Sequence, residues 1–436
     1  GDTGAIETPA PRITCPRIDR KADWPGTDVL DENGDGATRA RGESVMESFV
    51  PRMGRGYAAG RNYDRGPGAH RDVSMLSPYI RRRLVLERDV VAAALAAHGP
   101  EAAEKFVQEV IWRGYFKGWL ERRPSVWAGY RDGLQRDLAM LDADLSLRRD
   151  VERAEAGRTG LDCVDAWTRE LIATGYLHNH ARMWFASIWI FTLGLPWRLG
   201  ADFFYRHLLD GDPASNTLGW RWVAGLHTRG KTYKAQTWNI SKYTCQRFSP
   251  RPDDLADDVR ALVSEEPEGL PPAEPPRVPL SPDPAEPSVL LITEEDCRVE
   301  DFNLAALDIR AAATLAGSHL RSPRPVAQRV AGFEAGALAD AASRSGFAAE
   351  SFRAGAPDDL LGWVERAGAR QVVTPYLPQG PLRDWLLRLE PALGARGVRL
   401  CEWRRDWDAA IWPHAAGGYF KVKKKIPEIL QTMGLA

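Results

Sequence analysis

A proline-rich segment in the second half of the chain limits the fold more than any other feature. Residues 264–288 hold nine prolines in 25 positions. Proline fixes its own φ angle and has no amide donor, so neither a helix nor a central strand can continue through such a run. A segment of this composition forms an extended, semi-rigid linker. It therefore predicts two folded units, which suits a length of 436 residues.

Before the linker, apolar residues recur at intervals of three and four, as Val90 and Ala94 do. This period is typical of helices with one buried face. Residues 185–195 are apolar on every side but too short to cross a bilayer, so we expect them inside a helical core. We predict a helical domain over 44–250, preceded by an extended or poorly ordered lead-in over 1–43.

Beyond the linker, short apolar runs alternate with helical stretches. Strands are predicted at 288–293, 325–331, 371–376 and 398–403, and helices at 303–316, 333–345, 357–367 and 380–394. Such alternation is typical of a Rossmann-like α/β domain with a mostly parallel sheet. We predict an acidic, proline-rich linker over 251–287, the α/β domain over 288–412 and a basic C-terminal segment over 413–436.

The net charge of −1 conceals an uneven distribution. Residues 51–250 contain 30 basic and 21 acidic side chains, whereas residues 251–300 contain 4 and 14. A basic half is compatible with a face that binds a polyanion. The alternative is an ordinary solvated surface beside an acidic linker, so charge suggests a partner without identifying one.

The cysteines predict a reducing environment. There are five, an odd number, widely spaced and without a CxxC pair, at positions 15, 163, 245, 297 and 401. We therefore expect no disulfide framework, no metal site, buried or inert thiols, and a cytoplasmic location. No apolar run reaches 18 residues, so we expect no membrane span.

Three ordered motifs in the helical half are more specific. They are Tyr63 with SMLSPY over 74–79, then EVIWR over 109–113, and then HNHARM over 178–183, DGD over 210–212, Asn216 and WRW over 220–222. In order and spacing these motifs resemble those of the photolyase/cryptochrome family. The resemblance implies an all-helical FAD-binding domain followed, in this chain, by the α/β domain.

The resemblance also implies which residues hold FAD. Hydroxyls and amides at a helix start, together with an arginine, suit the two phosphates. Asn216 stands where photolyases place the residue that faces flavin N5, and Arg182 matches the arginine that pairs with Asp210 beside the ring. The residues expected to bind FAD are Tyr63, Ser74, Met75, Leu76, Ser77, Arg113, Arg182, Asp210, Asp212 and Asn216.

The same resemblance implies a site for damaged DNA. Trp112 and Trp222 match the two indoles that flank a cyclobutane pyrimidine dimer, and Glu109 matches the carboxylate that hydrogen-bonds to it. Asn179 and Met183 stand where (6-4) photolyases have histidines, which favours cyclobutane chemistry. We expect these five residues to be catalytic, UV-damaged DNA to be the partner, and light-driven dimer splitting to be the activity. The alternatives are a cryptochrome-like photoreceptor without repair, and a flavoprotein with another light-driven or redox reaction.

Two features depart from the usual family pattern. The α/β half follows the flavin half, so we expect a circularly permuted chain. Trp220 and Trp197 match the proximal and middle tryptophans of the family's electron-transfer chain, but Ala154 occupies the distal position. The alternatives are another indole nearby in sequence, with Trp189 expected ahead of Trp184 and Trp167, and a flavin that is reduced chemically. No signature identifies an antenna chromophore, and the cysteines are too few for an iron–sulfur cluster. We expect a monomer.

Overall fold

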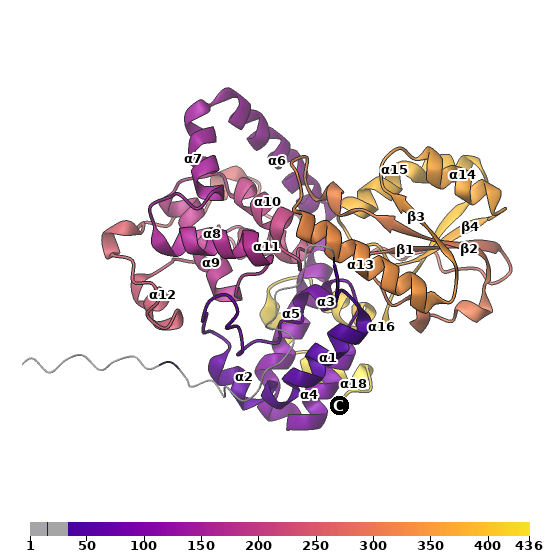
Figure 1. Ribbon diagram of the computed structural model, residues 1–436, viewed down its shortest axis with the longest axis horizontal. Helices are drawn as coiled ribbons and strands as arrows, with labels where there is room; N and C mark the ends of the chain where they lie inside the picture. Colours follow the sequence, from indigo (N-terminus) through magenta and orange to yellow (C-terminus); the bar gives the residue numbers. More distant parts are fainter. Residues whose placement is uncertain (1–14, 16–33) are drawn as a thin grey trace, which may run out of the picture.

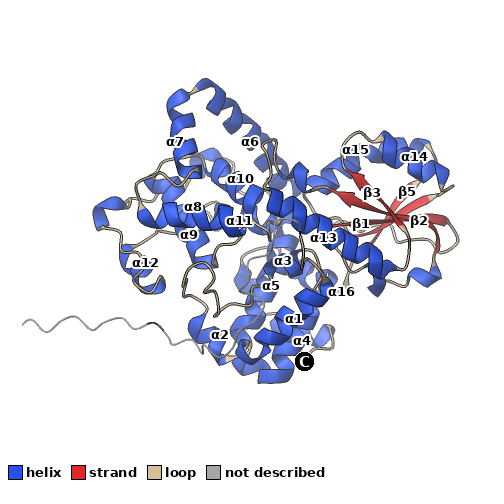
Figure 2. Ribbon diagram, viewed as in Figure 1, coloured by secondary structure: helices blue, strands red, loops and turns tan. Residues whose placement is uncertain are grey.

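The computed structural model describes residue 15 and residues 34–436. A helical part and an α/β part lie side by side (Figures 1 and 2). The helices of the first part are α1 (Arg39–Phe49), α2 (Arg55–Gly60), α3 (Ser77–Arg81), α4 (Glu87–Ala102), α5 (Glu104–Glu121), α6 (Pro124–Ala143), α7 (Leu145–Glu155), α8 (Asp162–Thr174), α9 (Asn179–Ser187), α10 (Trp197–His207), α11 (Pro213–Val223) and α12 (Thr237–Tyr243). Within the described range, no helix is long and apolar enough to cross a membrane.

The α/β part is built on a parallel sheet. Its strands are β1 (Pro287–Thr293), β2 (Asp308–Ala316), β3 (Ala349–Arg353), β4 (Gln371–Pro375) and β5 (Arg399–Trp403). They lie in the order β3-β2-β1-β4-β5, and every neighbouring pair is parallel. Crossover helices α13 (Gln328–Ser345), α14 (Asp358–Arg366) and α15 (Pro381–Ala395) connect later strands. The predicted fold class, helical followed by Rossmann-like α/β, is confirmed.

Two predicted elements of this part are wrong, and one strand was missed. Residues 303–316 were expected to be helical because alanine favours helices, but 308–316 form β2. Four consecutive residues of β2 are buried, and pairing with β1 and β3 outweighs helix propensity. The strand expected over 325–331 runs instead into α13. The missed strand, β3, is an edge strand without a fully buried residue, so it carries no apolar signal.

The two faces of the sheet belong to different cores. Leu290 and Ile292 of β1 pack with Phe333 of α13 into a cluster that continues through the helical part. Val289 and Leu291 point the other way, into a cluster shared with α14 and α15. Because one core runs through both parts, the α/β part and the helical part pack as one body at this face.

Buried ion pairs reinforce this junction. Arg81, the last residue of α3, forms two hydrogen bonds of 3.0 and 2.9 Å with Glu295, just beyond β1. The next residue, Arg82, contacts Glu294 at 3.2 Å. All four side chains are buried. The carboxyl end of β1, beside the reversal of strand order where α/β proteins usually bind ligands, is therefore occupied by the helical part.

The N-terminal region and the C-terminus also pack on the helical part. Helix α1 begins at Arg39, so the predicted lead-in is wrong for its last residues, while 1–14 and 16–33 lie outside the described residues. Helices α16 (Asp406–Ile411), α17 (Tyr419–Lys423) and α18 (Ile426–Thr432) follow the sheet, and α16 and α17 contact α5. The chain therefore returns to the helical part at its end.

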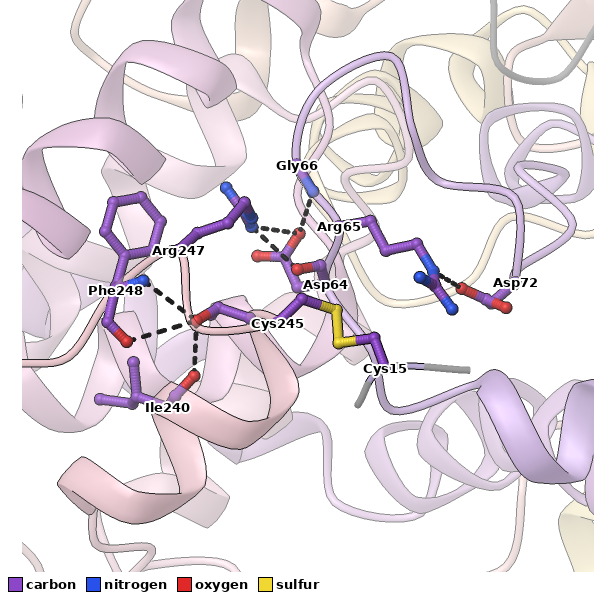
Figure 3. The surroundings of a disulfide bond; sticks show 10 residues. Cys15, Asp64, Arg65, Gly66, Asp72, Ile240, Cys245, Arg247 and Phe248 are labelled. Atoms are coloured by element: carbon purple, nitrogen blue, oxygen red, sulfur yellow. Dashed lines mark hydrogen bonds and ion pairs between the residues drawn. A yellow bond between two sulfur atoms is a disulfide. The ribbon is translucent and has the colours of Figure 1, made fainter. Parts of the chain in front are cut away.

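A disulfide corrects the expectation drawn from the cysteines. Cys15 and Cys245 are bonded across a sequence separation of 230 residues, with Cα atoms 5.7 Å apart. Figure 3 shows the bond beside Asp64 and Arg247. Cys163, Cys297 and Cys401 are free and buried. Spacing could not reveal this pair, because the two cysteines are 230 residues apart and meet only in the tertiary structure.

Candidate functional site

One cavity brings together most of the residues predicted for the site. It has a volume of about 220 Å³ and lies among α5, α9, α10 and α11. The predicted residues that line it are Glu109, Trp112, Arg113, Asn179, Arg182, Met183, Asp210, Asp212, Asn216 and Trp220. Residues from motifs that lie more than 60 positions apart in sequence thus line the same cavity.

An ion pair fixes one side of the cavity. Arg182 of α9 donates two hydrogen bonds to Asp210, at 3.0 and 2.7 Å, and Ser77 donates a third at 2.6 Å. Burial alone would raise the pKa of Asp210, but the charge and hydrogen bonds of Arg182, with the bond from Ser77, hold that pKa below its ordinary value of 3.8. Asp210 is therefore a fixed negative charge, and Arg182 is held beside it.

The loop that carries Asp210 is held by arginines that the sequence analysis missed. Arg82 donates to the Leu209 carbonyl at 2.7 Å, and Arg81 donates to the Gly211 carbonyl at 2.7 Å. Arg321, from the α/β part, donates to the Leu208 carbonyl at 2.7 Å. The run RRR directly after the SPY motif was visible in the sequence, but its targets depend on the tertiary structure.

The start of α11 presents polar groups to the cavity. Asp212 caps this helix, accepting hydrogen bonds from the Ser215 amide (3.3 Å) and hydroxyl (2.8 Å). Burial opposes the charged form of Asp212, but Arg81, Lys117 and Arg113 together keep its pKa low. Asn216, one turn later, donates to the Ala201 carbonyl at 2.8 Å. This bond fixes the amide plane of Asn216 at the cavity wall.

Arg113 is the unpaired cation of the cavity. Its Nη1 atom is buried and has no hydrogen-bond partner among the described residues. A buried guanidinium nitrogen without a partner costs free energy, so a site of this kind suits an anionic ligand. Asp212 nearby feels the charge of Arg113 but forms no hydrogen bond with it within the described chain.

Glu109 and Trp112, both on α5, also line the cavity. Glu109 accepts a hydrogen bond from Arg61 at 2.9 Å, and its side chain is 40% exposed. Desolvation of the carboxylate by the surrounding protein raises the pKa of Glu109, and the positive charge of Arg61 offsets this rise only in part. Trp112 stacks on Tyr419, with ring centroids 3.7 Å apart.

Several predicted residues do not line the cavity. Trp222 stacks on Tyr233, with centroids 5.5 Å apart, and Tyr63 packs on Tyr243 at 5.1 Å. The remaining ones are Ser74, whose hydroxyl accepts a hydrogen bond from an amide two residues on, Met75 with φ of 58°, Leu76 in the core, and Ser77, which reaches the cavity only through its bond to Asp210. The expected role of Trp222 at the lesion and those of the other residues at the flavin stay predictions.

The tryptophans predicted for electron transfer fall into two groups. Trp220 lines the cavity and packs edge to face on Trp189, with centroids 6.3 Å apart. Trp197 instead packs on Tyr130 at 5.9 Å and donates to Glu265. All three indoles are buried. Of these two tryptophans, Trp189 and not Trp197 packs on Trp220, beside the nearer ring of Phe204 at 5.0 Å.

Histidines near the site bind backbone groups. His178 caps α9 and contacts the Arg61 carbonyl at 2.8 Å, and His180 contacts the Asn62 carbonyl at 3.0 Å. These bonds join the start of α9 to the segment that holds Arg61. They occupy Nε2 of His178 and Nδ1 of His180.

Asp64, His70 and Glu170 form a buried group with the spacing of metal ligands. His70 is already bonded to Glu170 at 2.8 Å, and Asp64 is paired with Arg247 at 3.2 Å. Asp64 Oδ2 and His70 Nδ1 are buried without a hydrogen-bond partner among the described residues, and we assign no function to this group.

Comparisons with known proteins agree on the helical part. Residues 106–255 match the family model described as the FAD binding domain of DNA photolyase. The chain is 34% identical over 231 residues to a deoxyribodipyrimidine photo-lyase of Streptomyces griseus, covering 49% of this chain and 47% of that one. It is 34% identical over 238 residues to a deoxyribodipyrimidine photo-lyase of Thermus thermophilus, covering 52% of each. A solved class III photolyase from Agrobacterium tumefaciens aligns with a TM-score of 0.40 and 22% identity, over 54% of this chain and 52% of that one.

The matched region contains the residues that line the cavity between Glu109 and Val223. Over its helical part the chain is similar to the FAD binding domain of DNA photolyase and to deoxyribodipyrimidine photo-lyases. It spans about half the length of the curated relatives that it matches.

Proposed function

We propose that this protein repairs cyclobutane pyrimidine dimers in DNA by a light-driven electron transfer. The observation that carries the proposal is the shared cavity. Glu109, Trp112, Asn179 and Met183, expected at the lesion, line the same cavity as the polar residues expected at the flavin. A reaction that passes an electron from a cofactor to a substrate needs this proximity.

The residues present fit FAD. Arg113 offers an unpaired buried donor for a phosphate, and Asp212 and Asn216 offer polar contacts at the start of α11. Arg182 holds a positive charge beside the cavity, which favours an anionic reduced ring. When bound and reduced, FAD supplies the photoexcited electron for the dimer. The cavity residues orient the cofactor and keep its surroundings polar.

The lesion end of the cavity would receive a dimer extruded from the DNA stack. Trp112 offers an indole face for stacking, and Glu109 can hydrogen-bond to the edge of a pyrimidine. Asn179 and Met183 lie next to each other on α9, with Nδ2 and Sδ 3.8 Å apart. In the protein alone Arg61 holds the Glu109 carboxylate, so we expect this bond to rearrange when a dimer enters.

We also propose that Trp220 and Trp189 carry electrons from the protein to the flavin. Trp220 lines the cavity, and the edge of Trp189 contacts it, so the two indoles form a short path away from the site. Trp189 is buried, with its Nε1 bonded to the Pro196 carbonyl at 2.9 Å. Trp197 lies on a separate aromatic cluster and would be a later or alternative step.

The test is a repair assay on an oligonucleotide that carries one cyclobutane thymine dimer. Chemically reduced protein is incubated with it under near-UV or blue light and in the dark, and restored thymines are counted. We expect light-dependent repair, and a severalfold lower yield for Glu109→Ala with flavin still bound. Glu104→Ala, an exposed carboxylate on the same helix, is the matched control. No repair by protein that carries reduced FAD would contradict the proposal.

One observation favours a second candidate, a cryptochrome-like photoreceptor. The second of the expected lesion-flanking indoles, Trp222, stacks on Tyr233 and does not line the cavity. A sensor needs the flavin but no complete dimer pocket. A flavin that photoreduces in a protein without repair activity would favour this function.

A further inference from the structure

The C-terminal segment formed by residues 417–425 packs against Trp112, one of the residues expected at the lesion. Its Tyr419 stacks on Trp112, with centroids 3.7 Å apart and planes tilted by 32°. The Tyr419 hydroxyl donates to the Gln108 carbonyl at 3.3 Å. Tyr419 is not among the residues that line the cavity, so it supports Trp112 from outside.

This C-terminal segment is anchored to α5. Tyr115 donates to the Gly417 carbonyl at 2.7 Å, and its oxygen contacts His227 at 2.8 Å. Val422 of α17 is fully buried. The segment is therefore a fixed part of the surface around the cavity.

The outer face of the segment is basic and aromatic. Phe420 is 73% exposed, and Lys421, Lys424 and Lys425 are exposed around it. Among the described residues, Lys425 pairs with Glu428, and no ion pair is formed by Lys421 or Lys424. The exposed Phe420 ring has Lys423 Nζ 5.7 Å from its centroid, so this segment presents an aromatic face and several cations together. Base stacking and phosphate contacts use this combination of groups.

We propose that this face binds the nucleic-acid strand next to the nucleotide that enters the cavity. The proposal rests on the proposed function, since it deepens the assignment of DNA as substrate. Lysines neutralise phosphates and release counterions, and an exposed ring offers a stacking surface for an unpaired base. The Tyr419–Trp112 stack places this chemistry directly beside the cavity.

Charge favours a nucleic acid over another kind of partner. The helical half that surrounds the cavity has its own basic surplus, 30 basic against 21 acidic residues over 51–250. The exposed lysines extend this surplus across the C-terminal end of the chain. A nucleic-acid strand that leaves the cavity would therefore meet cations both on the helical half and on the C-terminal segment.

The test measures binding of a fluorescein-labelled, single-stranded oligothymidylate without a lesion, in the dark, between about 50 and 200 mM salt. The full chain is compared with the combined variant Lys421→Ala, Lys424→Ala and Lys425→Ala. Loss of three phosphate contacts should reduce the slope of log affinity against log salt by about 2. Phe420→Ala should weaken binding at least about fivefold with the slope unchanged.

The matched control replaces three exposed arginines on the far side of the α/β part, Arg366, Arg370 and Arg388, with alanine. It removes the same charge, and α14 and α15 lie away from the cavity helices (Figure 1). The control should leave the slope near that of the wild type. Equal slopes for the lysine variant and the wild type, or no binding by the wild type, would overturn the proposal.

Thermal unfolding midpoints check that the variants are folded, which we expect because the replaced lysines are exposed.

The repair proposal and the proposal for this binding surface can fail independently of each other. A slope change without any repair activity would keep this surface and reject the photolyase assignment. Repair with an unchanged slope would keep the enzyme and reject this surface.

Discussion

Arg81 and Glu295 form a buried, two-bond ion pair that joins the helical part to the α/β part. The remaining nitrogen of this guanidinium, Nε, donates to the carbonyl of Gly211. Burial alone would lower the pKa of Arg81, but Glu295 and its neighbouring carboxylates raise it, so the cation is retained. The second part of the protein therefore helps to shape the cavity, although none of the described strands lines it.

Loss of this pair should destabilise the protein and loosen the cavity loop. Glu295→Ala leaves the Arg81 charge buried without its carboxylate, and breaking a buried pair costs about 3–5 kcal/mol. Urea unfolding measures the free energy of unfolding, and flavin absorbance after gel filtration measures how much flavin the variant retains. Asp308→Asn, in an exposed pair with Arg310, is the control and should leave both quantities unchanged.

The double variant Arg81→Met with Glu295→Leu separates the two effects. Replacing both charges with apolar groups should recover much of the lost stability. Flavin retention should stay low, because the Gly211 carbonyl still lacks its donor. Full recovery of flavin binding would show that Arg81 does not position the loop.

Arg113 should contribute to flavin affinity more than to stability. Its Nη1 has no protein partner among the described residues, so Arg113→Gln leaves no protein group unpaired. A hydrogen bond to a charged group contributes about 1.5–3 kcal/mol, which corresponds to a loss of roughly 10- to 150-fold in affinity. Titration of the flavin-free protein with FAD, followed by flavin fluorescence, measures the affinity for FAD. Unchanged affinity would place the phosphates elsewhere.

Gly200 allows the two indoles of the proposed electron path to meet. A Cβ atom at this position would lie 2.3 Å from Trp220 and 2.9 Å from the Trp189 nitrogen. Both rings are buried and have no room to move, so Gly200→Ala should cost about 1–3 kcal/mol from overpacking. It should also slow flavin photoreduction, measured by absorbance during illumination with a reductant. Gly129→Ala in α6, where a Cβ meets no atom within 4 Å and which does not line the cavity, is the control.

Stability should fall as the solution becomes acidic. Burial lowers the pKa of His178 to about 3 and that of His227 to about 3, while the unfolded chain has the ordinary value of 6.5. Below pH 6.5 the unfolded state therefore binds more protons, and unfolding becomes easier until about pH 3. Each histidine should lower the free energy of unfolding by up to about 1.4 kcal/mol for every pH unit of acidification in this window.

Urea unfolding at pH 7.5 and 5.5 tests this dependence. His227→Gln retains a donor for Tyr115 but cannot titrate, so the loss of stability between the two pH values should be smaller by about 1.4 kcal/mol. A variant that loses as much stability on acidification as the wild type would show that His227 is not kept neutral by the fold.

Much of the cavity could be predicted from the sequence. Helical periodicity and short motifs are local properties, and residues such as Trp112 and Asn216 lie in motifs that can be identified by their order and spacing in the sequence. Strands β1, β4 and β5 were predicted for a related reason, because a buried strand is a continuous apolar run. Where burial and local propensity agree, the sequence is sufficient.

The rest was decided by contacts between distant segments. The Cys15–Cys245 bond, the pairing of Arg81 with Glu295 and the stack of Tyr419 on Trp112 each join residues more than 200 positions apart. In β2, sheet pairing outweighed the helix preference of alanine, and Trp189 rather than Trp197 met Trp220 because of how α10 packs. Such choices depend on free energies of long-range packing, which no local pattern of residues records.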